Sequence, residues 1–190
     1  MLNDSVNLSL YCLKYAESVL CENMVFLGGS SEKVIPISFA IYLIQSGDKN
    51  ILVDAGCDYM PGFDMKKFYS PTFVVRQVGL SADEITDVII THAHHDHIEA
   101  IKHFRNAIVH ILEQEYLNGK MYIPHNMTIN IIKEKYAITP QISIIKWGGH
   151  SVGSAVVEII GKKKHTSLQG MSAILMSAFI VKFRPVVIMS

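Results

Sequence analysis

The chain has 190 residues, of which 49% are hydrophobic and 18% charged, and this balance excludes an intrinsically disordered protein. Lys and Arg number 17, as do Asp and Glu, so a formal net charge of zero gives no electrostatic attraction for nucleic acid or an anionic membrane. The three cysteines, Cys12, Cys21 and Cys57, lack the spacing of a metal site, and we expect reduced thiols in a cytoplasmic protein.

The first third of the chain is predicted to form strands. Apolar stretches at 6–14 and 24–27 are interpreted as two opening strands. A β-branched and aromatic stretch at 38–44 leads through a Ser-Gly-Asp turn into 51–53, which is typical of a hairpin. Asp54 stands at the end of that hairpin, where its local position predicts that it caps a turn.

Helix signals and a buried strand follow the hairpin. Ser70-Pro71 has the form of an N-cap with proline at the first helical position, and it predicts a helix over 73–78. Ser81-x-x-Glu84 has the spacing of a capping box for another helical turn. The β-branched stretch at 85–90 then predicts a strand that is buried.

Four potential metal ligands come directly after this strand: His92, His94, Asp96 and His97. His92 and His94 are two apart in extended chain, so they project to the same side of it. Neutral imidazole suits zinc, and a nearby carboxylate adds an oxygen ligand that a second divalent ion accepts. A solvated histidine-rich loop is the alternative interpretation. The position after a buried strand favours two adjacent metal sites.

Further strands and helices are predicted after the histidines. A helix is expected over 98–104, a strand over 107–112, a helical turn over 113–117 and a strand over 142–147 that delivers His150 from the following loop. Strands that alternate with helices and hairpins indicate an α/β sandwich with helices outside paired sheets. Packing or surface roles, and no metal, are assigned to the remaining histidines of this region: His95, His103, His110 and His125.

Three motifs together resemble the metallo-β-lactamase superfamily, and within it the N-acyl homoserine lactonase-like members. They are Leu52-Val53-Asp54-Ala55-Gly56, His92-Ala93-His94-His95-Asp96-His97 and Gly148-Gly149-His150-Ser151-Val152-Gly153-Ser154. The resemblance implies a metal-dependent hydrolase with an αββα sandwich, of which residues 1–164 form the domain. The second half of that sandwich is expected to be incomplete.

The resemblance also implies roles for individual residues. His92, His94 and His150 would hold one Zn²⁺, and Asp96 and His97 would begin a second site. Asp96 and Asp54 are assigned to catalysis, Asp54 indirectly through the histidine loop. Hydroxide on zinc would then attack the carbonyl of a small ester, lactone or thioester.

The chain departs from the family pattern in three respects. No Asp follows Asp96, so the carboxylate that would bridge two metals is missing, and His165 comes too early to be the final ligand. Glu99 stands where a small residue is usual and is expected to crowd or alter the site. The number of zinc ions therefore stays open between one and two, with one expected.

Residues 165–190 are interpreted as an atypical apolar tail. Permitted codons for residues 165–173, read two nucleotides later, can spell Tyr-Ile-Ile-Ala-Gly-Asp-Glu-Cys-Tyr, which restores the missing Gly-Asp. A frameshift near codon 165 is therefore one hypothesis for this tail. The apolar stretch at 171–181 is shorter than the roughly 20 residues of a membrane span, so no membrane anchor is expected.

Two alternatives to a lactone or ester hydrolase remain open. A thioesterase similar to glyoxalase II would share all of the motifs present, whereas the missing Asp favours an inactive metal-binding fragment. An incomplete sandwich would also leave apolar surface exposed, so a homo-oligomer is expected.

Overall fold

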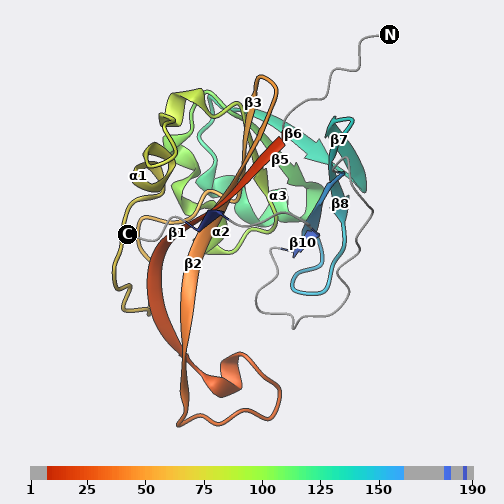
Figure 1. Ribbon diagram of the computed structural model, residues 1–190. Coiled ribbons are helices and arrows are strands. Elements are labelled where there is room, and N and C mark those ends of the chain that lie inside the picture. Colours follow the sequence, from red (N-terminus) through yellow and green to blue (C-terminus); the bar gives the residue numbers. More distant parts are fainter. Residues whose placement is uncertain (1–7, 161–177, 181–185, 188–190) are drawn as a thin grey trace.

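The computed structural model describes residues 8–160, 178–180 and 186–187, which form two packed β-sheets with helices against the larger one (Figure 1). The strand order is β11-β1-β2-β3-β4-β5-β6 in the larger sheet and β10-β9-β8-β7 in the smaller. The predicted α/β sandwich is confirmed.

In the larger sheet β2 is antiparallel to both β1 and β3, β11 is parallel to β1, and β3 to β6 are parallel to one another. Its strands are β1 (Leu8–Cys21), β2 (Val34–Ser46), β3 (Lys49–Val53), β4 (Asp87–Ile90), β5 (Ile108–Leu112), β6 (Thr128–Ile132) and β11 (Val186–Val187). The smaller sheet contains β7 (Lys135–Thr139), β8 (Ile142–Lys146), β9 (Ala155–Ile159) and β10 (Ala178–Ile180).

The helices are short. The α-helices are α1 (Pro71–Arg76), α2 (His95–Ile98) and α3 (Glu113–Gly119), and the 3₁₀ turns are η1 (Glu22–Met24), η2 (Ala82–Glu84), η3 (Glu99–His103) and η4 (Lys120–Tyr122).

Two apolar cores lie on opposite faces of the larger sheet. In β4, Val88 and Ile90 belong to the core under the helices, whereas Ile89 belongs to the core between the sheets. All three side chains are fully buried, which explains why this strand reads as an uninterrupted apolar run. Among the described residues, no helix contributes to the core between the sheets. Of the two outer helical layers of an αββα sandwich, the described residues show the one that packs against the larger sheet.

Local sequence signals before the histidines are confirmed. The hairpin of β2 and β3 closes with Ser46 opposite Lys49. At α1 the hydroxyl oxygen of Ser70 accepts a hydrogen bond from the backbone N–H of Phe73 at 3.2 Å. The capping box before η2 is also present, with the carboxylate of Glu84 accepting from the Ser81 N–H at 2.8 Å.

Other predicted elements need correction. Residues 24–27 form no strand, because the N–H groups of Val25 and Phe26 both donate to the carbonyl oxygen of Glu22 and turn the chain. The single strand β1 continues instead to Cys21. The helix predicted over 98–104 begins earlier, at His95, and continues as the 3₁₀ turn η3 after Ile98. Strands β6, β7 and β9 were not predicted.

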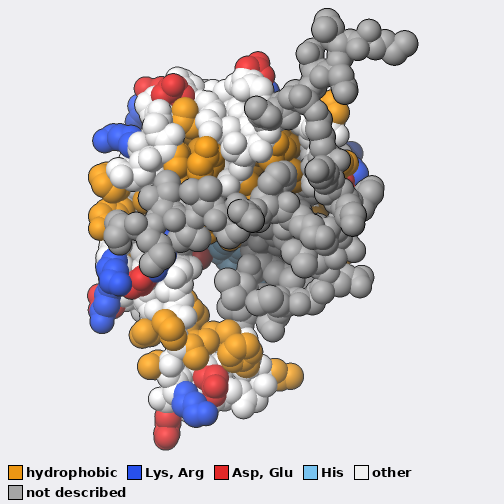
Figure 2. Space-filling view, viewed as in Figure 1, with side chains coloured by type: hydrophobic (Ala, Val, Ile, Leu, Met, Phe, Trp, Pro, Cys, Tyr) orange, Lys and Arg blue, Asp and Glu red, His pale blue; other side chains and the backbone are white. Residues whose placement is uncertain are grey.

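The outer parts of β1 and β2 form an arm that projects from the body of the molecule (Figure 1). Apolar side chains gather on this arm, as Figure 2 shows. Those at least 46% exposed along it are Val19, Met24, Phe26, Leu27 and Val34. No helix within the described residues is long and apolar enough to cross a membrane. His165 and the predicted boundary after residue 164 lie outside the described residues.

Candidate metal centre

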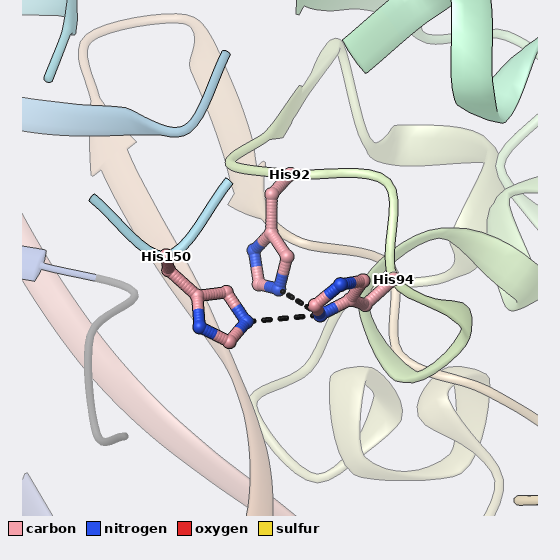
Figure 3. Close-up of side chains that lie close together, drawn as sticks. All are labelled: His92, His94 and His150. Atoms are coloured by element: carbon pink, nitrogen blue, oxygen red, sulfur yellow. Dashed lines mark hydrogen bonds between the residues drawn. The ribbon is translucent and has the colours of Figure 1, made fainter. Parts of the chain in front are cut away.

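Three imidazoles from two loops point toward one another (Figure 3). His92 and His94 lie between β4 and α2, and His150 lies between β8 and β9. Nδ1 of His94 lies 3.1 Å from Nε2 of His92 and 2.9 Å from Nε2 of His150. One nitrogen from each ring falls within 4.8 Å of the others. The side chain of His92 is buried, and those of His94 and His150 are exposed, so the cluster is open on one side.

The two loops meet because their strands end at the same edge of the sandwich. The backbone N–H of Ala155, the first residue of β9, donates to the carbonyl oxygen of Thr91 at 2.8 Å. Gly148 and Gly149 have φ of 77° and 95°, a conformation that L side chains rarely adopt. These glycines turn the chain between β8 and His150.

Asp54 is buried beneath the histidines and has φ of 63°, which an Asp tolerates better than most residues. Its Oδ1 accepts hydrogen bonds from the N–H of Thr91 at 2.8 Å and from the hydroxyl of Thr91 at 2.9 Å. Its Oδ2 lies 2.7 Å from Nδ1 of His97. Burial alone would raise the pKa of Asp54, but the neighbouring His97 and these hydrogen bonds lower it. Asp54 is thus a carboxylate that holds the histidine loop.

Asp96 and His97 lie together beside His92. Nε2 of His97 is 3.4 Å from Oδ2 of Asp96, and the rings of His97 and His92 have centroids 3.8 Å apart. Burial favours neutral His97, but the carboxylates of Asp54 and Asp96 outweigh burial and raise the pKa of His97 to about 10. Burial would raise the pKa of Asp96, and the hydrogen bond from His97 lowers it to about 2. A divalent cation would replace the proton on His97, because metal ligands must be deprotonated.

The donor set of the three converging imidazoles fits zinc. Burial, with the neighbouring His97, lowers the pKa of His92 to about 3, and burial with His94 lowers that of His150. Neutral imidazole is the form that binds a metal, and three such ligands leave the fourth position of a tetrahedral zinc open. A second ion would find Asp96 and His97 beside this site.

Three of the other described histidines contact protein groups and not the converging rings. His95 lies 2.9 Å from the carbonyl oxygen of Tyr59, His103 lies 2.8 Å from Asp58 and His110 lies 2.8 Å from Asp87, while His125 is exposed. The carboxylate of Glu99 accepts a hydrogen bond from the backbone N–H of Asp58 and forms an ion pair with Lys102. It is not part of the group of converging histidines.

Two residues that support the centre were not predicted. The hydroxyl of Tyr15 donates to the carbonyl oxygen of Asp96 at 3.2 Å, and Glu115 accepts hydrogen bonds from both ligand loops. Tyr15 lies 81 residues before its partner, so no local pattern indicates it. For Glu115 the only signal is its position just after the strand 107–112, at the edge where parallel strands end.

The sequence matches one family model. This model, described as the metallo-beta-lactamase superfamily, covers residues 40–163. The relative AiiB of Agrobacterium fabrum, an N-acyl homoserine lactonase, is 28% identical over 48% of this chain and 39% of its own length. An N-acyl homoserine lactonase of Bacillus thuringiensis is 24% identical over 76% of this chain and 67% of its own. The chain thus spans between about two fifths and two thirds of these relatives.

Solved structures share the fold. A mutant of B. thuringiensis AiiA with N-decanoyl-L-homoserine bound at its active site superposes with a TM-score of 0.71 at 21% identity, covering 79% of this chain and 69% of that one. AidC, a dizinc quorum-quenching lactonase, superposes with a TM-score of 0.67 at 19% identity, covering 83% of this chain and 69% of that one.

Proposed function

Because the chain belongs to the metallo-beta-lactamase superfamily, we propose that it is a zinc-dependent hydrolase whose substrate is a small lactone. The convergence of His92, His94 and His150 carries this proposal, since it presents three imidazole ligands and an open side. The lactone is proposed because two of the relatives are N-acyl homoserine lactonases.

The residues of the centre have separate tasks in this proposal. Zinc supplies Lewis-acid activation of water and of a carbonyl oxygen when it is bound. His92, His94 and His150 would hold it, and Asp96 and His97 would begin a second site. Asp54 would act indirectly, because its hydrogen bonds to Thr91 and His97 fix how the ligand loop leaves β4.

The inactive metal-binding fragment is the second candidate, and one observation favours it. No Asp follows Asp96 within these 190 residues, so they supply no Asp to bridge a second ion. Loss even of a residue that only orients a ligand costs roughly 10- to 100-fold in metal affinity, and loss of a direct ligand should cost at least as much. We therefore expect about one tightly held zinc per chain. Sequencing the gene across codon 165 tests the frameshift hypothesis, and an uninterrupted frame in related genes would refute it.

Metal analysis tests the centre. Elemental analysis of the purified chain should find zinc in the wild type and none in His92→Ala, His94→Ala or His150→Ala. The matched control is His125→Ala, because His125 is an exposed histidine that is not among the converging rings. Stoichiometric zinc in the first three variants, or its loss in the control, would mean that other residues bind the metal.

A substrate comparison tests the reaction. Purified, zinc-loaded protein is offered an N-acyl homoserine lactone and a glutathione thioester at equal concentrations, with the His94→Ala variant as the blank. Hydrolysis of the lactone supports the proposal. Hydrolysis of the thioester alone would favour the glyoxalase II-like alternative, and no hydrolysis by a zinc-loaded chain would favour the inactive fragment.

Two further properties belong to this proposal. A cytoplasmic location is supported by the cysteines, which are all free thiols. Self-association is supported by the exposed apolar side chains of the β1–β2 arm.

A further inference from the structure

We propose that Glu115 is a positioning residue of the candidate metal centre, joining the loop that carries His92 and His94 to the loop that carries His150. This inference rests on the proposed zinc centre and assigns Glu115 no contact with the metal or substrate. Its carboxylate would set the distance between the two loops, and so the geometry of the three imidazoles.

The carboxylate of Glu115 accepts hydrogen bonds from both loops. Oε2 accepts from the backbone N–H of Ala93 at 2.8 Å, between His92 and His94. Oε1 accepts from the hydroxyl of Ser151 at 2.7 Å and from the backbone N–H of Gly153 at 3.0 Å, just after His150. One oxygen therefore serves each ligand loop.

Burial makes this linkage costly to break. The Glu115 side chain is only 2% exposed, and all of its hydrogen-bond donors in the described residues are neutral. A charged acceptor typically forms stronger hydrogen bonds than a neutral one. A buried N–H left without an acceptor is unfavourable, so these hydrogen bonds stabilise the two loops in this arrangement.

The space around Glu115 admits little adjustment. A Cβ added to Gly153 would lie 2.8 Å from Oε1 of Glu115 and 2.8 Å from Cβ of Gln114. On the other side, a Cβ added to Gly119 would lie 3.0 Å from Cβ of Ala93. Helix α3, which carries Glu115, is thus in close contact with both ligand loops. It acts as a fixed support, because it packs beside β5 in the larger sheet.

Glutamine is the sharpest substitution because it keeps the shape of the side chain. A carboxylate accepts at both oxygens, whereas an amide accepts at its oxygen and donates at its nitrogen. In Glu115→Gln the amide oxygen can still accept hydrogen bonds from one loop. The amide nitrogen, however, turns an N–H toward a hydrogen-bond donor of the other loop. The matched control is Glu113→Gln, which makes the same change at an exposed position of the same helix.

The test compares these variants with the wild type by two measurements. Zinc affinity is measured by competition with a chromophoric chelator, and amide hydrogen exchange of residues 91–97 and 148–154 is measured in metal-free protein. We expect Glu115→Gln to lower zinc affinity by roughly 10- to 100-fold. It should also speed exchange in at least one of the two loops, whereas Glu113→Gln should match the wild type in both measurements.

Other outcomes separate this inference from its premise. Wild-type zinc affinity in Glu115→Gln, even with a lower melting temperature, would show a merely structural role and overturn the inference. Unchanged exchange in both loops would also overturn it. If the wild type itself binds no zinc, the proposed function fails, and the exchange measurement still decides whether Glu115 joins the loops.

Discussion

Asp87 offers a quantitative test of what stabilises the larger sheet far from the metal centre. This carboxylate is 1% exposed at the start of β4. Its Oδ1 lies 2.8 Å from Nε2 of His110, and its Oδ2 accepts from the hydroxyl of Thr86 at 2.6 Å and from the ammonium of Lys49 at 2.9 Å. Burial would raise the pKa of Asp87, but these hydrogen bonds outweigh burial and lower it to about 2.

The lowered pKa predicts a dependence of stability on pH. The ordinary value is 3.8, so the difference corresponds to about 2 kcal/mol at roughly 1.36 kcal/mol per pKa unit. Because the pKa is lower in the folded state, this stabilisation is fully present well above the unfolded pKa and is lost as pH falls through the folded one. About half of it should remain at about pH 3.

Asp87→Asn should therefore lower the free energy of unfolding by about 2 to 4 kcal/mol at neutral pH, including the cost of the partners left unpaired. The difference from the wild type should shrink by about 1 kcal/mol at about pH 3. Urea unfolding followed by circular dichroism, with EDTA in every sample, measures both values.

The matched control is Asp64→Asn, since the side chain of Asp64 is 85% exposed and its nearest cation, Lys66, is 3.8 Å away. It should change the free energy of unfolding by less than about 0.5 kcal/mol at either pH. The reasoning would be refuted by an Asp87→Asn variant as stable as the control. If Asp87→Asn lowers the free energy of unfolding by the same amount at both pH values, the predicted dependence on pH is wrong.

Three further substitutions test the packing and the local signals. Phe104→Ala, in the core under the helices, should lower the free energy of unfolding by about 3 to 5 kcal/mol in urea. A loss below about 1 kcal/mol would mean that neighbouring side chains move in and fill the cavity. Ser70→Ala should cost about 0.5 to 2 kcal/mol in the same assay through loss of the cap on α1, and no loss would mean that water replaces the hydroxyl. Gly119→Ala should lower the melting temperature and the zinc affinity together, because its new Cβ would lie 2.8 Å from Cδ1 of Ile98 and 3.0 Å from Cβ of Ala93; a change in melting temperature alone would show that the strain stops short of the histidine loop.

Signals between near neighbours in the sequence were sufficient for part of the fold and part of the site. The caps at Ser70 and Ser81, the hairpin between Ser46 and Lys49, and the strand before His92 each depend on residues within a few positions of one another. In an extended chain the alternation of side chains also brings His92 and His94 to one side. These features needed no knowledge of the rest of the molecule.

Elements whose conformation depends on distant partners were not predictable in this way. The stretch 24–27 is apolar enough for a strand, yet its N–H groups turn back to Glu22, and Leu27 is fully exposed at the tip of the arm. Strands β6 and β7 carry exposed or half-buried residues at most positions. Burial does not alternate along these two strands, so it leaves no periodic pattern in their sequence. They are strands because they pair with β5 and β8.

The same division applies to the candidate metal centre. The sequence by itself determined which side chains could bind a metal, because residue type and local spacing fix the chemistry of a ligand. Only the tertiary structure decided that His150 lies 2.9 Å from His94, 56 residues earlier in the chain. It also placed the carboxylate of Glu115 between their loops. Contacts of this kind depend on two sheets packing at one edge, and no spacing within either loop encodes that distance.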